Sequence, residues 1–573
     1  MTIGLQTGRG RRFVSFTAVV GTSLLIAACG GGDDDDAGTA GAQSATDTPT
    51  AEADTQGSEG DGGGAEASEQ VLRMAWGAEP PSLDPGLATD TTSSNVLFNI
   101  MDPLVKLDEN LEPQPSLAES FEQNGTTVTY KLRTDGRWTN GDPVTAKDFE
   151  YSWKRTLDPA LGADYSYQLY GIKGAEEYNT CEKACEKLKD AVAVKAVDDT
   201  TLEVELTSAQ PWFLAQSAHH SFLAVHQPTV EKFKEKWTEP ANIVTNGAFK
   251  LTEWEHEASI TLEKNDQWRD AANVKLTRVE GKIIVDGTTR VAAFEAGEVD
   301  ALDGGGLPPA DIPRLKETPE YENYPALGTY MYEFNTKNIP DVNQRKAMSM
   351  AIDRRTIIDK IAQADQIPAT SMSPQGIPGF DEIKQDYIQE NADIDAAKEL
   401  MAQAKNPKTE INLVLNNSPG HKEIATAIQS MWQPLGIKVS IKQQEWAQFL
   451  EFIGPPADPS VDVNRYGWIG DFPDAINFLE LWTCKGGNNH SGYCDPAYDA
   501  LVKQAKNTAD EAERFALYKQ MEEMLFSEEK GAFPVMPIYW YTYVNLERET
   551  IKDTFEINLL DQFDLTKVVV QEG

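Results

Sequence analysis

The chain has 573 residues, of which 91 are Asp or Glu and 51 are Lys or Arg, so its formal net charge at pH 7 is −40. So large an excess of acids argues against binding to nucleic acid and against resting on anionic lipid, because phosphate groups would repel it. The length is too great for a single hydrophobic core and predicts two or three lobes.

The first predicted element is a lipoprotein signal peptide over residues 1–28. Three arginines precede an apolar run from Phe13 to Ala28, and small residues then lead to Cys29. This order is typical of a bacterial signal that is cleaved before a cysteine that receives lipid. An ordinary secretory signal that ends at a chance cysteine is the alternative. The run is shorter than the roughly 20 apolar residues of a membrane span. We therefore expect lipidation at Cys29 and a chain anchored to the outer face of the cytoplasmic membrane, on its extracellular or periplasmic side.

A disordered acidic tether is predicted over residues 29–70. After Cys29 this stretch contains mainly Gly, Ala, Ser and Thr, together with eleven acids and no base. A composition with so little apolar surface cannot offset the entropy that ordering would cost. A flexible chain of about 40 residues has a root-mean-square span on the order of 35 Å. We expect this tether to let the folded part move about its anchor.

The rest of the chain alternates predicted strands with predicted helices. Strands have apolar residues at every second position, and helices have them at a period of 3.6. The pattern predicts strands at Val128–Arg133, Thr201–Leu206, Ile260–Lys264, Ile411–Leu415, Ile437–Lys442 and Pro537–Leu546. It predicts helices at Thr145–Leu157, Gln344–Ala362, His421–Leu435 and Ala497–Phe526. This alternation indicates open α/β sheets.

The four cysteines after Cys29 form two pairs that are close in sequence. Cys181 precedes Cys185, and Cys484 precedes Cys494. In an oxidising compartment such pairs are expected to close loops as disulfides. Zinc binding is the weaker alternative, because a Cys-x3-Cys pair supplies too few ligands.

No catalytic or metal-binding motif is apparent. The chain has no G-x-S-x-G, no phosphate-binding glycine loop and no H-E-x-x-H. His219, His220 and His226 are close in sequence, but their spacing fits no known set of metal ligands. We therefore expect no enzyme activity, no cofactor and no bound metal.

The segment Arg465–Phe472, RYGWIGDF, has the features of a ligand site. A single carboxylate, Asp471, stands among aromatic residues and glycines. A buried charge persists only when it is paired, so such a carboxylate suits an ammonium group. The glycines allow a ligand to approach the main chain closely. A strand that ends in a structural aspartate is an equally ordinary interpretation.

Several segments together resemble one protein family. They occur in the same order as in that family and are Ser82–Pro85, Trp138–Arg155, Lys236–Leu251, Gly297–Asp300, Gln444–Leu450 and Arg465–Phe472. On these segments the chain resembles the family 5 extracellular solute-binding proteins, and most closely the members that bind oligopeptides for ABC importers. The resemblance extends from about residue 72 to about residue 546.

The resemblance implies a two-lobed fold of the periplasmic-binding-protein type, class II, with an extra N-terminal subdomain. Lobe I would comprise residues 71–328, including the subdomain at about 105–220. Lobe II would comprise residues 329–540, and residues 541–573 would return to lobe I. Hinge closure would enclose the ligand.

The family's ligand-binding residues can be carried over to this sequence by position. Asp471 matches the carboxylate that receives the α-ammonium group of a peptide. Gly467 and Trp468 match the strand that pairs with the peptide backbone, and Thr91 matches the opposing segment. The remaining matches are Tyr165 beside the first peptide residue, Trp446 on a pocket wall, Arg465 and His421 near the peptide C-terminus, and Tyr539 and Trp540 in the aromatic crossing.

Some family features differ in this chain. An arginine that follows the QEW segment in a close relative is absent from residues 452–456, and the positions of a family cysteine pair hold Gly328 and Ile469. Cys484 and Cys494 resemble a disulfide of dipeptide-binding members. The preferred peptide length therefore stays open.

The resemblance implies a monomeric, non-catalytic receptor that passes oligopeptides to ABC permease subunits. Two alternatives remain: a family 5 receptor for a non-peptide solute, such as a nickel chelate, a sugar or an opine, and a ligand sensor that keeps the fold.

Overall fold

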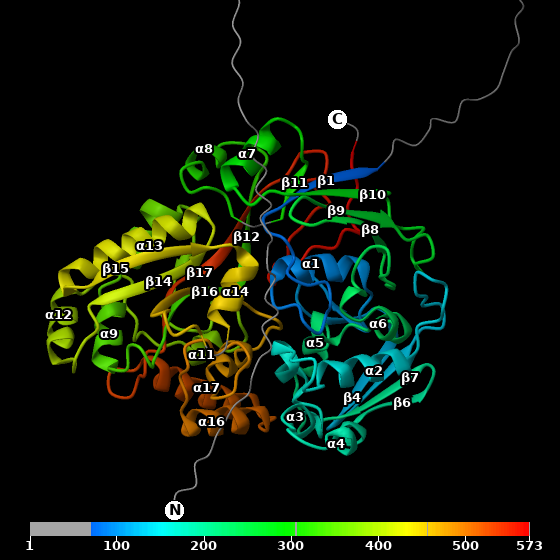
Figure 1. The fold of residues 1–573 in the computed structure, drawn as a ribbon, viewed down its shortest axis with the longest axis horizontal. Coiled ribbons are helices and arrows are strands. Elements are labelled where there is room, and N and C mark those ends of the chain that lie inside the picture. Colours follow the sequence, from blue (N-terminus) through cyan, green and yellow to red (C-terminus); the bar gives the residue numbers. More distant parts are fainter. Residues whose placement is uncertain (1–69, 304–305, 455–456, 572–573) are drawn as a thin grey trace, which may run out of the picture. The chain divides into compact units, whose positions relative to one another are not determined.

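The computed structural model describes residues 70–571, except residues 304–305 and 455–456. The predicted signal peptide, Cys29 and almost all of the predicted tether lie outside these residues. Within the described part, no helix combines the length and the apolar character that crossing a bilayer needs. Helices alternate with mixed sheets along the chain (Figure 1), which confirms the predicted α/β class.

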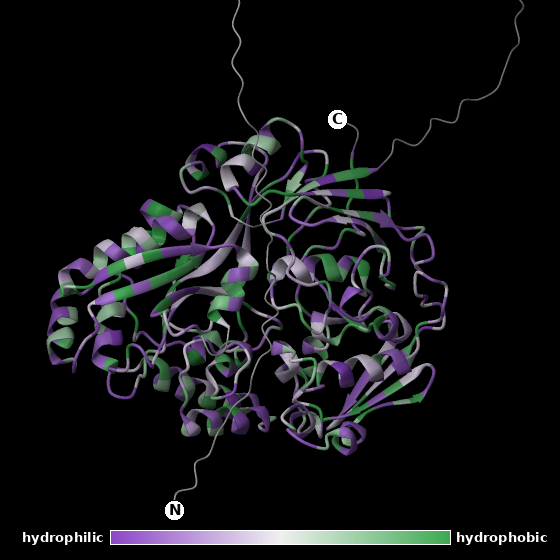
Figure 2. Ribbon diagram, in the orientation of Figure 1, coloured by the Kyte–Doolittle hydropathy of each residue, from purple (hydrophilic) through white to green (hydrophobic). Residues whose placement is uncertain are grey.

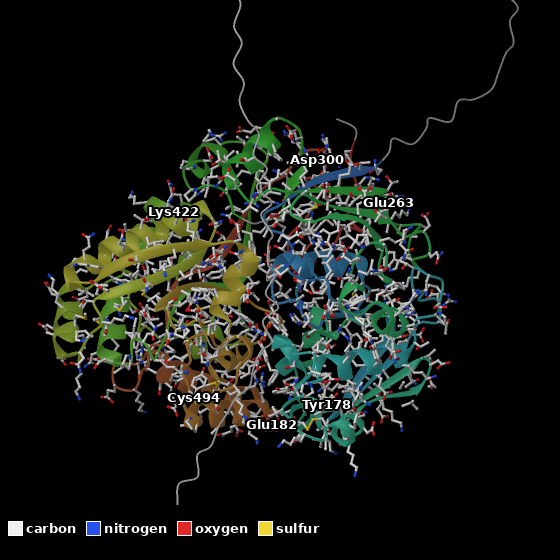
Figure 3. The ribbon with its side chains drawn as sticks, viewed as in Figure 1. Tyr178, Glu182, Glu263, Asp300, Lys422 and Cys494 are labelled. Carbon is white, nitrogen blue, oxygen red and sulfur yellow. A yellow bond between two sulfur atoms is a disulfide. The ribbon has the colours of Figure 1, made fainter. Side chains whose placement is uncertain are left out.

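The first lobe is built on a five-stranded sheet in the order β11-β1-β10-β9-β8. β1 is parallel to β10 and β11, and the other pairs are antiparallel. Leu72 and Met74 of β1 are buried in a core that α1 also covers. At the β11 edge of the sheet, the backbone N–H of Arg73 donates to the side chain of Asp300 over 3.0 Å, which ties β1 to the start of β11. Figure 3 labels Asp300 beside these strands. The bounds are β1 Val71–Trp76, α1 Thr91–Ile100, α6 Gln227–Phe233, β8 Phe249–Glu255, β9 Ser259–Lys264, β10 Arg278–Ile283, α7 Gly287–Glu295, β11 Ala301–Leu302 and α8 Ile312–Leu315.

A second sheet of four antiparallel strands, in the order β4-β5-β7-β6, has its own core. Helix α2 covers it and begins where the sequence predicts, because Thr145 and Asp148 form a capping box. Trp153 of α2 packs edge-on against Tyr130 of β5. The bounds are β2 Val105–Leu107, β3 Pro113–Pro115, β4 Ala118–Asn124, β5 Thr127–Leu132, α2 Ala146–Thr156, η1 Asp164–Leu169, α3 Ala175–Asn179, α4 Glu186–Ala191, β6 Val194–Asp198, β7 Thr201–Glu205, α5 Phe213–Gln216 and η2 His220–Phe222.

The second lobe is built on a six-stranded mixed sheet in the order β13-β17-β12-β16-β14-β15. β14 is parallel to β15 and β16, whereas β12 is antiparallel to β16 and β17. Figure 2 shows the hydrophobic colour along β14 and within the helices beside it. The bounds are β12 Tyr321–Phe334, α9 Val342–Met350, α10 Arg354–Ile357, η4 Ile358–Ala362, β13 Ile367–Pro368, α11 Phe380–Ile383, α12 Ile394–Gln403, β14 Glu410–Asn416, α13 Pro419–Trp432, η5 Gln433–Leu435, β15 Lys438–Gln444, α14 Trp446–Ile453, β16 Val463–Ile469, α15 Ile476–Leu479, α16 Pro496–Lys506, α17 Glu511–Phe526 and β17 Val535–Leu546.

The long strands β12 and β17 pair with each other and contribute to the cores of both lobes. Ala326 and Tyr543 pack with residues of the first lobe, whereas Tyr330 and Tyr539 pack within the second. β17 ends beside β11, because Glu547 forms a bridge with Ala301. The predicted lobe boundaries at residues 328 and 540 fall within these two strands.

Two of the predicted long helices are each broken in the structure. The predicted helix Gln344–Ala362 divides into α9, α10 and the π-helical turn η4, because Asp353 caps a new helix through the N–H of Thr356. The predicted helix Ala497–Phe526 divides into α16 and α17, because Asp510 caps α17 in the same way. An apolar period of 3.6 continues across such breaks, so the period alone does not reveal them. The other predicted helices and strands are confirmed to within three residues.

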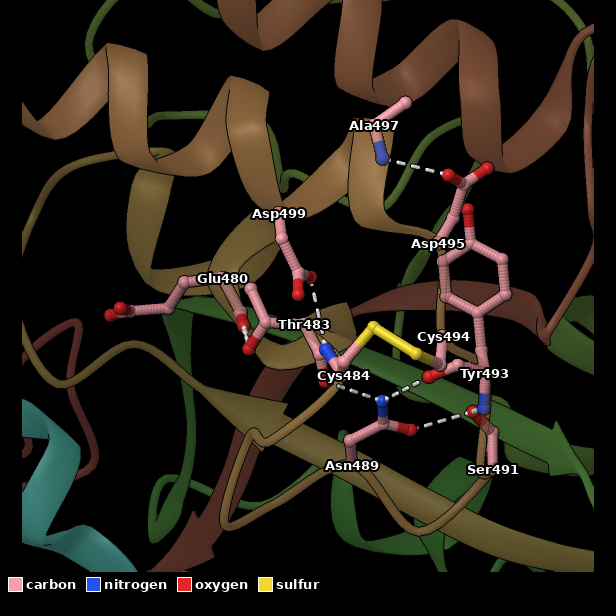
Figure 4. The surroundings of a disulfide bond; sticks show 10 residues. All are labelled: Glu480, Thr483, Cys484, Asn489, Ser491, Tyr493, Cys494, Asp495, Ala497 and Asp499. Carbon is pink, nitrogen blue, oxygen red and sulfur yellow. Dashed lines mark hydrogen bonds between the residues drawn. A yellow bond between two sulfur atoms is a disulfide. The ribbon is translucent and has the colours of Figure 1, made fainter. Parts of the chain in front are cut away.

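Both predicted cysteine pairs are bonded as disulfides. Cys181 is bonded to Cys185 between α3 and α4, in the loop beside Glu182 (Figure 3). The second bond, Cys484–Cys494, closes a loop before α16 (Figure 4). Inside that loop Asn489 donates to two backbone carbonyls over 2.8 Å, and the N–H of Cys484 donates to Asp499 over 3.0 Å. The loop is therefore held by polar contacts as well as by the bond.

Candidate ligand-binding site

Strand β16 leads directly to the candidate carboxylate, Asp471. Its side chain is only 8% exposed. Asn477 of α15 donates to one carboxylate oxygen over 2.8 Å. The amide oxygen of Asn477 accepts two hydrogen bonds of 2.9 Å each, from the backbone N–H of Asp471 and from the indole N–H of Trp468. One asparagine thus fixes the carboxylate and the neighbouring indole together.

Two further donors reach Asp471 from the first lobe. Gln168 of η1 donates from Nε2 over 2.5 Å, and His219 places Nε2 3.2 Å from the other carboxylate oxygen. Gln168 is itself held by Gln216 over 2.7 Å, and His219 by Ser221 over 2.9 Å. Among the described residues, no Lys or Arg lies within 4 Å of this carboxylate. Asp471 therefore lies where the two lobes meet, with an amide, an imidazole and a second amide as its partners.

Aromatic rings line this junction. Tyr165, 5% exposed, stacks on Trp468 with ring centres 6.0 Å apart and on Tyr167 at 5.7 Å. Its ring also lies 5.0 Å from that of His219. Burial, together with the carboxylate of Asp471, raises the pKa of Tyr165 well above its ordinary value, so its phenol stays protonated. The rings make a neutral wall around one carboxylate.

At the other end of β16, Arg465 lies in a box of tyrosines. Its guanidinium is centred 5.0 Å from the ring of Tyr330 and donates to the hydroxyl of Tyr541 over 2.7 Å. Its Nε is buried without a hydrogen-bond partner. No carboxylate of the described residues lies within 4 Å of Arg465, although a buried cation normally has one.

His421 and Tyr539 complete this box. The hydroxyl of Tyr330 lies 3.2 Å from Nδ1 of His421, and its ring stacks on Tyr539 at 4.6 Å. Burial and the charge of Arg465 hold the pKa of His421 well below its ordinary value, so the imidazole is neutral. Arg465 is then the charged group of the box.

Gly467 separates these two groups on the same strand. A β carbon at this position would lie 2.3 Å from the hydroxyl oxygen of Tyr541 and 2.9 Å from Nη2 of Arg465. Only glycine leaves room for that hydrogen bond. Residues 465, 467 and 469 share one face of β16 because strand residues alternate between faces.

One edge of β16 is partly open. β16 pairs with β12 over all of its length. On its other side, β14 pairs only with Val463 and Asn464. Within the described part of the chain, no strand covers that second edge from Arg465 to Ile469. Such an edge can accept an added strand, because its N–H and C=O groups have no ladder partner.

The other predicted residues lie farther along the junction or behind it. Trp446 begins α14 and stacks on Phe449, and its indole faces Asp90, the residue that caps α1. Thr91 is the first residue of that helix. Trp540 is 5% exposed and packs edge-on against Phe380. Asp471, Trp468 and Tyr165 thus form one group, and Arg465, Gly467, His421 and Tyr539 form another.

Sequence reasoning did not identify Gln168, Asn477 or Tyr541, and it considered His219 only as a metal ligand. Among the described residues, no group of three or more His, Cys, Asp or Glu is placed to hold a metal ion. Gln168 lies 303 residues before Asp471 and has no distinctive sequence pattern around it. The tyrosine-rich strand β17 was the one signal that pointed toward Tyr541.

Comparison with known proteins places this chain in one family. A sequence model described as bacterial extracellular solute-binding proteins, family 5, middle, matches residues 112–490. The oligopeptide-binding protein OppA of Bacillus subtilis is 37% identical over 514 residues, which cover 87% of this chain and 92% of that relative. The crystal structure of Haemophilus influenzae OppA in complex with the peptide RPPGFSPFR is similar with a TM-score of 0.82 and 29% identity, over 88% of this chain and 100% of that one.

Two structures of another relative differ in their similarity to this one. The murein tripeptide-binding protein MppA of Escherichia coli matches with a TM-score of 0.79, over 88% of this chain and 99% of that one. The unliganded open form of MppA matches with a TM-score of only 0.60, over 88% of this chain and 98% of that one. Both are 29% identical to this chain. The lobes of this protein are therefore arranged less like the open form than like the other MppA structure.

Proposed function

The chain belongs to family 5 of the bacterial extracellular solute-binding proteins, and on that premise we propose that it captures oligopeptides between its lobes and delivers them to an ABC importer. Members of this family are transport receptors, so the chain is a receptor rather than an enzyme. The relatives named for oligopeptide binding support peptide as the ligand.

The observation that carries the proposal is an open strand edge with opposite charges at its two ends. Residues 465–469 offer unpaired backbone groups, Asp471 lies beyond one end and Arg465 lies at the other. An extended peptide has backbone groups to pair with this edge, an ammonium group for Asp471 and a carboxylate for Arg465. The five strand residues 465–469 extend about 17 Å, which suits peptides of about two to five or more residues.

Recognition through the main chain allows peptides of different sequences to bind. Every peptide has the same backbone, so pairing with β16 does not depend on the side chains. Thr91, Trp446 and Tyr165 would line the surroundings of the peptide. Water between the peptide side chains and these walls would adapt to different residues at modest cost.

The ammonium group of the peptide would take the place of Gln168 and His219 at Asp471. Gln168 and His219, both from the first lobe, occupy the carboxylate in this structure. A cation interacts with a buried carboxylate more strongly than an amide such as that of Gln168 does. These donors come from the first lobe and Asp471 from the second, so the ammonium group would bind at the junction that hinge closure encloses.

Lipid at Cys29 would hold this receptor beside its permease. The anchor would keep a receptor from diffusing away, and the tether would let the lobes search for and dock on the transporter. These parts of the proposal rest on the sequence.

Native mass spectrometry of the purified protein tests the ligand class. We expect co-purified ligands that dissociate as a mixture of short peptides with free termini and varied sequences. A homogeneous non-peptide ligand, such as a sugar or a metal chelate, would contradict the proposal.

A further inference from the structure

The C-terminal tail inserts a short loop, residues 558–562, between the two lobes. The carbonyl of Leu559 accepts from the backbone of Leu327 in β12 over 2.7 Å. The carbonyl of Asp561 accepts from Asn95 of α1 over 2.8 Å. Leu560 packs 3.4 Å from where a β carbon of Gly470 would lie, one residue before Asp471. The loop therefore touches α1, β12 and the end of β16.

Within this loop Asp561 has a buried carboxyl group with unused hydrogen-bonding capacity. It is 7% exposed, and its Oδ1 has no hydrogen-bond partner. Its backbone adopts φ +58°, a left-handed conformation that aspartate and asparagine adopt more readily than most other residues except glycine. The loop thus places a carboxyl group at a position where water is largely excluded.

The neighbours of Asp561 are polar but uncharged, apart from one acid. The hydroxyl groups of Thr91 and Tyr543 lie beside its carboxyl group, and the hydroxyl of Tyr543 is itself buried without a partner. Asp303 is the nearby acid, and it is occupied by Arg290 over 2.9 Å and by the N–H of Gly77 over 2.7 Å. No Lys, Arg or His of the described residues lies within 4 Å of Asp561. Two buried polar groups therefore face each other without a cation between them.

Leaving a buried carboxyl group and a phenol unpaired costs free energy, which a ligand with the right chemistry would recover. A cationic group suits this place, because it donates to the carboxylate and to the phenol oxygen. Thr91, which the proposed function places beside the bound peptide, lies next to the carboxyl group of Asp561, so a side chain of that peptide is within reach.

We propose that Asp561, with Tyr543 and Thr91, forms a subsite for a lysine or arginine side chain of the bound peptide. This subsite rests on the proposed peptide-binding function and adds a side-chain preference to it. Asp561 is then a specificity-determining residue, distinct from Asp471, which receives the amino terminus.

The subsite also predicts a coupling between binding and protons. Burial raises the pKa of Asp561 well above its ordinary value, which favours the protonated form of this group in the empty receptor. A bound cation favours the ionised form. Binding of a cationic side chain therefore releases a proton, and its affinity rises with pH over the range between the free and bound pKa values.

Calorimetry with a positional peptide set tests the subsite. Ligand-free protein is titrated with tri-alanine and with peptides that carry lysine or norleucine at each position. In the wild type, lysine at one position beyond the amino terminus should bind about tenfold tighter than norleucine or more, and should release protons in buffers of different ionisation enthalpy. Equal affinities at every position would overturn the proposal.

Variants assign the preference to its residues. Asp561→Asn should abolish the lysine preference and the proton release while tri-alanine binds as before, and Tyr543→Phe should weaken the preference. The control Asp564→Asn, in the same tail, should keep it. A preference that survives Asp561→Asn would contradict the assignment. Failure of tri-alanine to bind the wild type would contradict the proposed function, whereas tri-alanine binding without a lysine preference would contradict only the subsite.

Discussion

In the proposed complex, Asp471 receives the ammonium group of the peptide in a buried setting. Asp471→Asn keeps the shape and the hydrogen bond from Asn477 but removes the charge. Leaving one partner of a buried ion pair alone costs about 3 to 5 kcal/mol, or roughly two to four orders of magnitude in affinity. Calorimetry with a tight peptide should show this loss, and the exposed Asp386→Asn should show none. Unchanged affinity in Asp471→Asn would refute the role of this carboxylate.

Arg465 has the corresponding role at the peptide's other end. Arg465→Met keeps the packing on Tyr330 but removes the cation, so peptides with a free carboxylate should lose about 2 to 5 kcal/mol of binding free energy. The same peptides with an amidated C-terminus should bind the wild type and the variant almost equally. An equal loss for both peptide forms would show that Arg465 acts only through packing.

At the scale of elements, the contact between Arg465 on β16 and Tyr541 on β17 depends on Gly467. Gly467→Ala would force Tyr541 away from Arg465, because the new methyl carbon would meet its hydroxyl at 2.3 Å. We expect a loss of about 1 to 3 kcal/mol in the free energy of unfolding and weaker binding of every peptide, whatever its sequence. Urea denaturation and calorimetry measure the two effects. Gly470→Ala, whose methyl carbon would make only ordinary contacts at 3.4 Å, is the control, and similar effects in both variants would contradict this role.

Some site residues and helix ends could be predicted from the sequence, and others could not. Asp471 could be identified because a lone acid among glycines and aromatic residues is distinctive within one segment. Gln168 and His219 could not, because their roles depend on a contact between lobes across about 250 to 300 residues of chain. Asp561 follows the predicted strands in an unremarkable tail. The breaks at Asp353 and Asp510 were missed because capping by a single aspartate does not change the apolar period.

At the scale of the whole molecule, two buried glutamates make stability depend on pH. Burial raises the pKa of Glu522 and of Glu547 from 4.5 to about 7. Glu522 lies under the Met372–Ser373 backbone, and Glu547 accepts from Tyr324 at the end of the β12–β17 pair. Both groups bind their proton more tightly in the folded chain, so their contribution is full below pH 4.5 and is lost as the pH rises through about 7.

Urea denaturation between pH 5 and pH 8 measures this dependence. The free energy of unfolding should fall over this range by up to about 3 kcal/mol per group. Glu522→Gln should make the decline shallower, whereas the exposed Glu529→Gln should leave it unchanged. A decline of the same steepness in Glu522→Gln would contradict the assignment to that residue.

Capture of peptides through both the main chain and the free amino terminus is the central claim for the whole molecule. Protein freed of ligand by denaturation and refolding is titrated by calorimetry with di- to penta-alanine and with the same peptides acetylated at the amino terminus. At least one free peptide should bind, and its acetylated form should bind about a hundredfold more weakly or not at all, because Asp471 would lose its cation. Equal affinity for the free and acetylated forms, or no binding of any free peptide, would contradict the claim.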